Sequence, residues 1–425
     1  MIPNLNNSTP VVILRSIAYA GLGIARSLGR LGIPVYTIEG VPNSPVFNSR
    51  YNREPFIWSI DDKPELESIE FLCEVSKKID GKPLLIPTTD YAAMFVARNA
   101  GRLRECFRFP EQPEGLVRSL CSKKEMYLLA KRMGIPTPET VFPQNLNDVN
   151  AFLRRAVFPV MLKAIDGTRL CEQVGKKMFI VNSAQELLEL YGRVEDTAEP
   201  NLMLQEYIPG GEDSVWMFNG YFNQNSDCLA GFTGKKIRQC PAYTGYTSLG
   251  ICVRNDTVDF LTRSFMKAIG YRGVLDIGYR YDARDGQYKV LDVNPRIGAT
   301  FRLFVGNNGL DVARAFYLHM TAQQVPATHL CEGRKWLVED RDLSSSLRYW
   351  RDGKLSARQW LTSFRGVRET AYLAADDMRP VFGRIKRVLA SSTRRLCVRV
   401  CSKLFSVSSH AGNTTSVTTD SAKAT

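Results

Sequence analysis

The chain has 425 residues, of which 44% are hydrophobic and 23% are charged. This composition is typical of globular proteins and excludes a chain that is disordered throughout. No apolar run approaches the ~18 residues of a membrane-spanning helix, and the polar residues 1–10 lack the layout of a signal peptide. We therefore expect a cytoplasmic protein of two to four domains.

The net charge of +13 is concentrated near the C-terminus. Seven lysines and arginines lie between Arg384 and Lys403, with no acidic residue among them, and they make up more than half of that charge. The remainder of the chain is only mildly basic. The charge therefore does not predict a specific nucleic-acid partner.

Cysteine and histidine usage narrows the chemistry further. The ten cysteines are scattered without a C-x-x-C pair, which favours a reduced compartment over a disulfide framework or a zinc site. The three histidines make a multi-histidine metal centre and a Ser-His-Asp triad improbable.

The N-terminal segment predicts a βαβ unit and hence a parallel sheet. Residues 11–14 are expected to form a strand, 24–31 a helix and 35–38 a second strand. The glycine turn between them resembles a dinucleotide fingerprint, but Arg26 stands where the third glycine would be, and an acid such as Glu39 is common after a second strand. A nicotinamide site is therefore the disfavoured alternative to a close-packed turn. A further strand over 84–87 and a helix over 90–103 follow.

The central segment predicts a mixture of helices and strands. We expect a helix over 122–134 and strands at 160–163, 179–181 and 202–208. Two further strands, 274–281 and 288–293, flank a turn and predict a hairpin. Beyond residue 325 the chain is expected to be mainly helical, and after 405 its Ser/Thr-rich composition predicts disorder.

The hairpin carries the most informative chemistry. Because alternate residues of a strand share a face, Asp292, Asn294 and Arg296 should point the same way. A carboxylate, an amide oxygen and a guanidinium suit a site for Mg²⁺ and phosphate. Asp276, on the preceding strand, can add a second carboxylate. The alternatives are a polar, solvent-facing strand and a pair of surface charges.

From these motifs the chain resembles the ATP-grasp superfamily, and within it the carboxylate–amine ligases similar to D-aspartate ligase and carbamoyl phosphate synthetase. The resemblance rests on Gly23–Gly29 and on Leu291–Arg296, and its motifs extend over about 122–325. It implies a Rossmann-like parallel-sheet domain, a two-subdomain ATP-grasp fold of mixed α/β and α+β class, and a helical extension. The expected boundaries are 1–119, 120–325, 326–382 and a tail over 383–425.

The resemblance also implies roles for individual residues. ATP contacts are expected from lysines near the phosphates and from the segment that meets adenine and ribose: Lys123, Lys163, Gln205, Glu206, Ile208, Glu212 and Lys235. Magnesium, with manganese as an alternative, is expected at Asp276, Asp292 and Asn294. Arg296, Lys163 and Arg302 are the expected catalytic residues. Open alternatives are Lys124 for Lys123, Asp213 for Glu212, and Lys236 or Arg238 for Lys235.

Two departures from the family pattern bear on activity. Gly278 stands where the family usually has an acid that binds magnesium, and the loop 164–175 is poor in glycine. The family resemblance as a whole implies an ADP-forming ligase that joins a small-molecule carboxylate to an amine through an acyl phosphate. The alternative is an ATP-binding protein that has lost or altered catalysis.

The tail and the assembly of the chain leave further expectations. Apolar residues recur near helical spacing among the basic residues of 384–405, which predicts either a peripheral membrane contact or a poorly ordered extension. Cys397 and Cys401 lie one helical turn apart and are candidates for acylation. The family also implies a homodimer.

Overall fold

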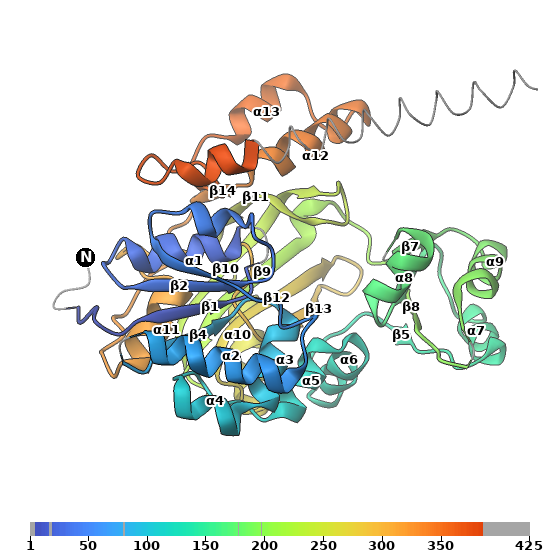
Figure 1. Ribbon diagram of the computed structural model, residues 1–425. Helices are drawn as coiled ribbons and strands as arrows, with labels where there is room; N and C mark the ends of the chain where they lie inside the picture. Colours follow the sequence, from blue (N-terminus) through green and yellow to red (C-terminus); the bar gives the residue numbers. More distant parts are fainter. Residues whose placement is uncertain (1–4, 17–18, 80, 177, 197, 386–425) are drawn as a thin grey trace, which may run out of the picture.

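The structure is a computed structural model that describes residues 5–16, 19–79, 81–176, 178–196 and 198–385. In these residues the strands form a parallel four-stranded sheet, an antiparallel four-stranded sheet and a seven-stranded sheet. Figure 1 shows the smaller antiparallel unit standing to one side of the main body. The expected membrane contact over 384–405 falls almost entirely outside the described residues, as do the acylation candidates Cys397 and Cys401 and the disorder expected after residue 405.

The N-terminal domain confirms the predicted parallel sheet, whose strand order is β3-β2-β1-β4. Its elements are β1 (Val11–Leu14), α1 (Ala20–Gly29), β2 (Val35–Glu39), η1 (Pro45–Asn48), β3 (Asn52–Ile57), α2 (Glu65–Lys78), β4 (Leu84–Pro87), α3 (Asp90–Arg98) and α4 (Ala100–Cys106). Val11 and Ile13 of β1 pack with Leu28 of α1, whereas Val12 and Leu14 pack on the opposite face in the cluster that contains α2. Helices therefore cover both faces, which explains the continuous apolar run.

Two helices, α5 (Glu114–Cys121) and α6 (Lys123–Arg132), connect this domain to the next. The Ser122 side chain accepts a hydrogen bond from the Glu125 backbone N–H and caps α6. This cap fixes Lys123 at the first position of the helix.

The second unit is the antiparallel sheet, of strand order β5-β8-β6-β7. Its elements are β5 (Thr140–Val141), α7 (Leu146–Leu153), β6 (Val160–Ala164), α8 (Gly167–Val174), β7 (Met178–Val181), α9 (Ala184–Val194) and β8 (Leu202–Glu206). Leu162 and Leu204 are paired across β6 and β8 and pack in one cluster with α7 and α9. Lys163, the next residue, therefore projects from the opposite face. The glycine-poor segment expected to be a loop contains the helix α8.

The seven-stranded sheet forms the centre of the molecule, with strand order β13-β12-β9-β10-β11-β14-β15. Its first part comprises η2 (Glu212–Ser214), β9 (Val215–Phe222), β10 (Cys228–Cys240), β11 (Tyr246–Cys252), α10 (Asp256–Ala268), β12 (Gly273–Asp282), β13 (Gln287–Asn294), η3 (Phe301–Leu303) and α11 (Val312–Met320). Phe218 of β9 packs with Phe265 of α10, whereas Tyr221 contacts Phe316 of α11 with ring centroids 6.0 Å apart. The predicted hairpin is confirmed as β12 and β13.

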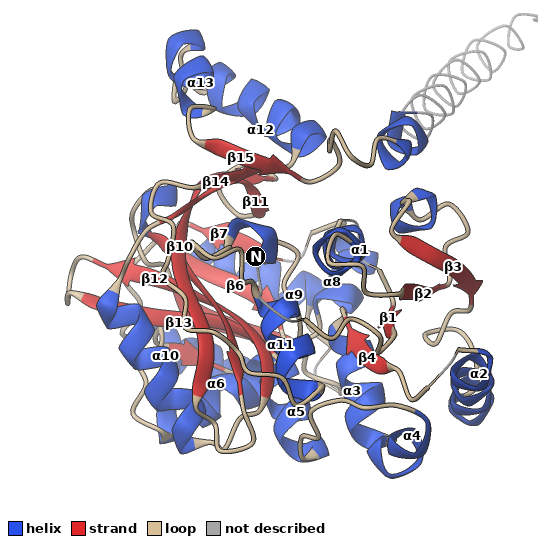
Figure 2. Ribbon diagram, turned by 90° about the vertical axis from the view of Figure 1, so that its left-hand side faces the viewer, coloured by secondary structure: helices blue, strands red, loops and turns tan. Residues whose placement is uncertain are grey.

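The C-terminal extension contains the expected helices and also two strands. Its elements are β14 (Lys335–Leu337), α12 (Glu339–Arg351), α13 (Ala357–Ser363) and β15 (Val367–Thr370). Strand β14 pairs with β11, so the extension continues the central sheet, and Figure 2 shows α12 and α13 lying beyond these strands. The chain then returns to the N-terminal domain, where Arg26 binds Asp377 with an Nε–Oδ2 distance of 2.9 Å.

Two observations concern the pairing of cysteines and the presence of membrane-spanning helices. Cys73 and Cys106 form a disulfide between α2 and α4, a pairing that the scattered cysteine spacing did not predict. The described residues contain no helix that is both long enough and apolar enough to cross a membrane.

Candidate functional site

The expected acidic residues meet at the end of the β12–β13 hairpin. Gly278 lies opposite Asp292 in the register, and Asp276 lies opposite Asn294. The Asn294 side-chain amide donates to Asp292 Oδ2 at 3.1 Å, and that of Asn219 donates to Asp276 Oδ1 at 2.7 Å. The hairpin therefore brings together the residues that the sequence predicted as metal ligands.

The electrostatics of this group suit a bound cation. Burial raises the pKa of the Asp276 carboxyl to about 6; Arg296 opposes the shift and the charge of Asp292 adds to it. The side-chain oxygen of Asn219 is buried beside Asp276 and has no hydrogen-bond partner among the described residues. The carboxylates of Asp276 and Asp292 and the amide oxygen of Asn219 are hard ligands of the kind that Mg²⁺ prefers. Within the described residues, no three or more His, Cys, Asp or Glu side chains form a metal cluster.

The glycine at 278 has a steric explanation. A Cβ atom built on Gly278 would lie 2.3 Å from Asp292 Oδ1, far inside van der Waals contact. The Asp292 carboxylate thus leans over the position that a side chain at 278 would occupy. An acid there requires Asp292 to move away.

Arg296 links this hairpin to the N-terminal domain. Its Nε donates to Asp90 Oδ1 at 2.8 Å, one Nη donates to Asn294 Oδ1 at 3.1 Å, and the other lies 4.0 Å from Asp276. Asp90 is the first residue of α3, directly after its cap Thr89. Sequence reasoning missed Asp90, although its place after a strand of a parallel sheet is where ligand-binding residues usually lie.

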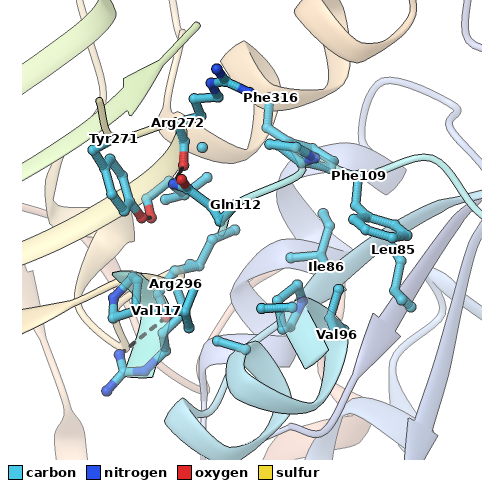
Figure 3. A pocket seen from close by; sticks show the side chains of 18 residues that line it. Leu85, Ile86, Val96, Phe109, Gln112, Val117, Tyr271, Arg272, Arg296 and Phe316 are labelled. Carbon is cyan, nitrogen blue, oxygen red and sulfur yellow. Dashed lines mark hydrogen bonds between the residues drawn. The ribbon is translucent and has the colours of Figure 1, made fainter. Parts of the chain in front are cut away.

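A pocket opens beside Arg296, between the N-terminal domain and the central sheet (Figure 3). Ile86 and Val96 line it on one side, and Tyr271 and Arg272 on the other. One side of the Arg296 guanidinium therefore lies near Asn294 and Asp276, and Arg296 also borders this largely apolar pocket.

Two predicted phosphate-binding lysines converge at the end of β6. The Lys123 ammonium donates to the Ala164 carbonyl at 2.9 Å, and the Lys163 ammonium donates to Gln205 Oε1 at 2.6 Å. Burial and the positive charge of Lys123 lower the pKa of Lys163 to about 8, while Asp292 acts in the opposite direction. A nearby anion would relieve this repulsion, so the pair forms a candidate phosphate site.

The predicted adenine segment is tied to the hairpin by ion pairs. Burial alone would raise the pKa of Glu206, but hydrogen bonds led by that from Lys289 lower it. The Glu206 carboxylate lies 2.8 Å from Lys289 and 2.6 Å from Arg284. The Ile208 carbonyl accepts a hydrogen bond from Arg280 Nε at 2.9 Å. These contacts fix the segment, and they occupy the Glu206 carboxylate that the sequence assigned to the nucleotide.

The predicted ribose acid and its neighbouring basic residues have distinct surroundings. Glu212 Oε1 accepts a hydrogen bond from the Tyr349 hydroxyl at 2.6 Å. Lys235 lies over the Trp216 ring at 5.7 Å. Lys236 is the residue that faces the acidic group: burial lowers its pKa, whereas Asp292 and then Asp276 raise it. Arg238, the third alternative, forms a buried ion pair with Asp342. The structure therefore favours Lys236 over Lys235 as the basic residue of the site.

Arg302 lies in a buried ion network. It forms an ion pair with Asp311, and a second nitrogen lies 2.7 Å from Glu369. Its side chain is 8% exposed. A substrate carboxylate would have to displace these acids before it could bind Arg302. The observed contacts of Arg302 are therefore structural ion pairs within the protein.

Comparisons with known proteins agree with this fold. No protein-family model matches the chain. D-aspartate ligase of Enterococcus faecium is 26% identical over 242 residues, which cover 55% of this chain and 57% of the relative. The large chain of carbamoyl phosphate synthase of Archaeoglobus fulgidus is 23% identical over 195 residues, 44% of this chain and 17% of the relative. The match thus spans less than two thirds of either relative.

Solved structures give the same result for the fold. N5-carboxyaminoimidazole synthetase of Staphylococcus aureus in complex with ADP has a TM-score of 0.59 at 14% identity, covering 77% of this chain and 82% of that chain. The biotin carboxylase domain of 2-oxoglutarate carboxylase from Hydrogenobacter thermophilus, with MgADP and bicarbonate, has a TM-score of 0.57 at 15% identity, covering 76% and 73%. The predicted fold class is thereby confirmed: the chain has the fold of the ATP-grasp proteins, and its sequence is similar to those of D-aspartate ligase and carbamoyl phosphate synthase.

Proposed function

We propose that the chain is an ATP-dependent, ADP-forming ligase that joins a small-molecule carboxylate to an amine. The observation that carries this proposal is that two buried lysines with lowered pKa values face the carboxylates of the hairpin: Lys163 interacts with Asp292, and Lys236 interacts with Asp292 and Asp276. Anionic phosphates would stabilise the charged forms of the lysines, and a divalent cation would stabilise the charged forms of the carboxylates. Mg²⁺-ATP supplies both partners together.

The nucleotide is proposed to lie between the antiparallel sheet and the central sheet. Lys123 and Lys163 would bind its phosphates, and the segment from Gln205 to Ile208 would border adenine. Glu212 would accept hydrogen bonds from the ribose hydroxyls. Asp276, Asp292 and Asn294 would hold magnesium or manganese, which when bound neutralises charge on the phosphate oxygens.

The reaction needs charge stabilisation and little proton chemistry. A substrate carboxylate oxygen attacks the γ-phosphorus, the bond to the β-phosphate oxygen breaks, and ADP leaves. An amine nitrogen then attacks the acyl carbon of the resulting acyl phosphate, inorganic phosphate leaves, and the nitrogen loses a proton. Lys163, Lys236 and Arg296 would stabilise the negative charge that moves during these steps, which explains a site without histidine.

The proposal extends to the substrate, to Arg302, and to the location and assembly of the chain. The similarity to D-aspartate ligase makes amino acids, and dicarboxylic ones first, the carboxylates to test. For Arg302 to anchor a substrate, the substrate carboxylate would have to displace Asp311 and Glu369, which already bind it. The proposal includes a cytoplasmic location, which the composition and cysteine usage predict, and a homodimer, which the family resemblance implies.

The second candidate function is nucleotide binding without ligation. Gly278 favours it, because the usual acid is absent. The position of Asp292 over Gly278 opposes it, because a carboxylate still lies at that point of the hairpin.

The first experiment is thermal unfolding of the purified chain with Mg²⁺-ATP, with ATP and EDTA, and with NADH. A ligand at a hundredfold excess over its Kd stabilises the fold by about 2.7 kcal/mol. We expect a shift with Mg²⁺-ATP that EDTA largely abolishes. A screen for ADP release with paired amino acids and amines then separates the two candidates. Absence of a nucleotide shift in a folded sample would contradict both.

A further inference from the structure

The C-terminal extension reaches the proposed ribose-binding acid. Tyr349 lies on α12, and its hydroxyl donates to Glu212 Oε1 at 2.6 Å across 137 residues of sequence. Tyr349 is 4% exposed. A residue outside the segment that carries the ATP-grasp motifs therefore contacts a group assigned to the nucleotide.

The Tyr349 hydroxyl is held in one orientation. The Tyr243 backbone N–H donates to its oxygen at 3.0 Å. The Tyr243 ring packs edge-on against the Tyr349 ring, with centroids 4.9 Å apart. Because the oxygen already accepts from this N–H and the hydroxyl has a single proton, that proton is directed to Glu212. Tyr349 thus acts as a fixed donor.

Helix α12 is itself anchored to the central sheet. Two nitrogens of Arg238 on β10 bind the two carboxylate oxygens of Asp342, each at 2.8 Å. Both side chains are almost fully buried, and the Ser248 hydroxyl of β11 lies 3.1 Å from the same carboxylate. A paired, two-point contact of this kind fixes the helix and with it the position of Tyr349.

We infer that Tyr349 is a positioning residue for the nucleotide sugar, which it serves by holding the Glu212 carboxylate ready to accept two ribose hydroxyls. A carboxylate has about four lone-pair sites, and Tyr349 takes one of them. The tyrosine and the sugar therefore bind Glu212 together and do not compete. This inference rests on the proposed binding of ATP.

The inference makes the C-terminal extension part of the nucleotide site. An unrestrained glutamate side chain loses rotamer entropy when a ligand orders it. The hydrogen bond from Tyr349 removes part of that cost before the nucleotide arrives. The benefit applies only to ligands that use Glu212, which are nucleotides with sugar hydroxyls.

The test compares two nucleotides on the full chain by isothermal titration calorimetry: Mg²⁺-ATP and Mg²⁺-2′,3′-dideoxy-ATP. Tyr349→Phe keeps the ring and removes the donor, and we expect Mg²⁺-ATP to bind about threefold to tenfold more weakly. Dideoxy-ATP should bind the variant and the natural chain equally. Tyr243→Phe is the matched control, because its hydroxyl bonds to Asp352 and not to Glu212.

A second comparison separates positioning from packing. If Tyr349 acts through Glu212, then Tyr349→Phe should have no further effect on ATP binding in a Glu212→Ala background. Equal weakening for both nucleotides would assign Tyr349 to packing and overturn the inference, as would unchanged ATP binding. Tighter ATP binding by Tyr349→Phe would mean that the tyrosine competes with the sugar. A natural chain that binds no Mg²⁺-ATP would overturn the proposed function and this inference with it.

Discussion

The N-terminal βαβ turn and the end of the β12–β13 hairpin both carry charged residues that resemble a ligand site. They differ in how far partners within the protein neutralise those charges. In the turn, Glu39 accepts from the Ser16 backbone N–H at 2.6 Å and lies 2.5 Å from Arg15. Arg26 is 2% exposed and binds Asp377 and three backbone carbonyls. Each charge is therefore matched by a partner within the protein.

At the hairpin the charges are less completely matched. Asp276 has a raised pKa, whereas Lys163 and Lys236 have lowered ones, and for all three burial is the leading cause. Buried charges whose ionised forms are disfavoured are characteristic of sites that bind a charged ligand. Residue types alone therefore do not distinguish a structural ion pair from a binding site. What separates them is how far the protein itself neutralises each charge.

Removing Asp292 should give the largest effect on catalysis. Asp292→Asn keeps the size of the side chain and removes the carboxylate nearest to Gly278. We expect turnover to fall about a thousandfold or more, in line with the loss of a preorganised electrostatic partner. ADP release measures it. Asp285→Asn is the matched control, because Asp285 lies at the turn of the same hairpin. Equal losses in both variants would show that the hairpin matters only for folding.

Breaking the ion pair between Arg26 and Asp377 should instead affect stability. Arg26→Met leaves the Asp377 carboxylate, which is 0% exposed, without its ion pair. Removing one partner of a buried pair costs about 3–5 kcal/mol. We expect that loss in the free energy of unfolding by urea, with an unchanged Kd for Mg²⁺-ATP in the folded variant. A nucleotide-binding defect without loss of stability would mean that the βαβ turn belongs to the active site.

The sequence predicts the local elements of the fold more completely than the contacts of the candidate site. The βαβ unit, the hairpin and the shared face of Asp292 and Asn294 follow from local periodicity, which the backbone obeys directly. Asp90 and Tyr349 could not be found that way, because each meets its partner from a distant segment of the chain. The sequence also cannot choose between Lys235 and Lys236, since adjacent residues on a strand point to opposite faces and no motif states which face is inward.

Restoring the family acid at 278 should weaken the enzyme and not repair it. Because any Cβ at this position meets Asp292 Oδ1, Gly278→Asp displaces the carboxylate that the hairpin already provides. We expect turnover to fall about a hundredfold. Gly278→Ala tests the steric part of the effect, since it adds the Cβ without a charge, and it should lose activity as well. A gain in turnover for Gly278→Asp would mark the natural chain as impaired and would favour the second candidate function.

The smallest effect we predict concerns pH and the Lys163 ammonium. Its pKa of about 8 in the folded chain lies below the ~10.4 of an unperturbed lysine. In the ligand-free protein this residue is therefore charged at pH 7 and mostly neutral at pH 9. Because phosphate binds the charged form, the Kd for Mg²⁺-ATP should rise about tenfold over this interval, as calorimetry at each pH can measure.

The same shift has a defined sign for stability. Above pH 8 the unfolded chain holds the Lys163 proton more tightly than the folded chain, so the contribution of this group to the free energy of unfolding rises between about pH 8 and pH 10.4. Replacing the lysine by methionine should remove both dependences, and replacing it by arginine, which stays charged, should remove the fall in ATP affinity. If the arginine variant showed the same tenfold change, the titrating group would be another one, and Lys236, whose pKa burial also lowers, would be the next to test.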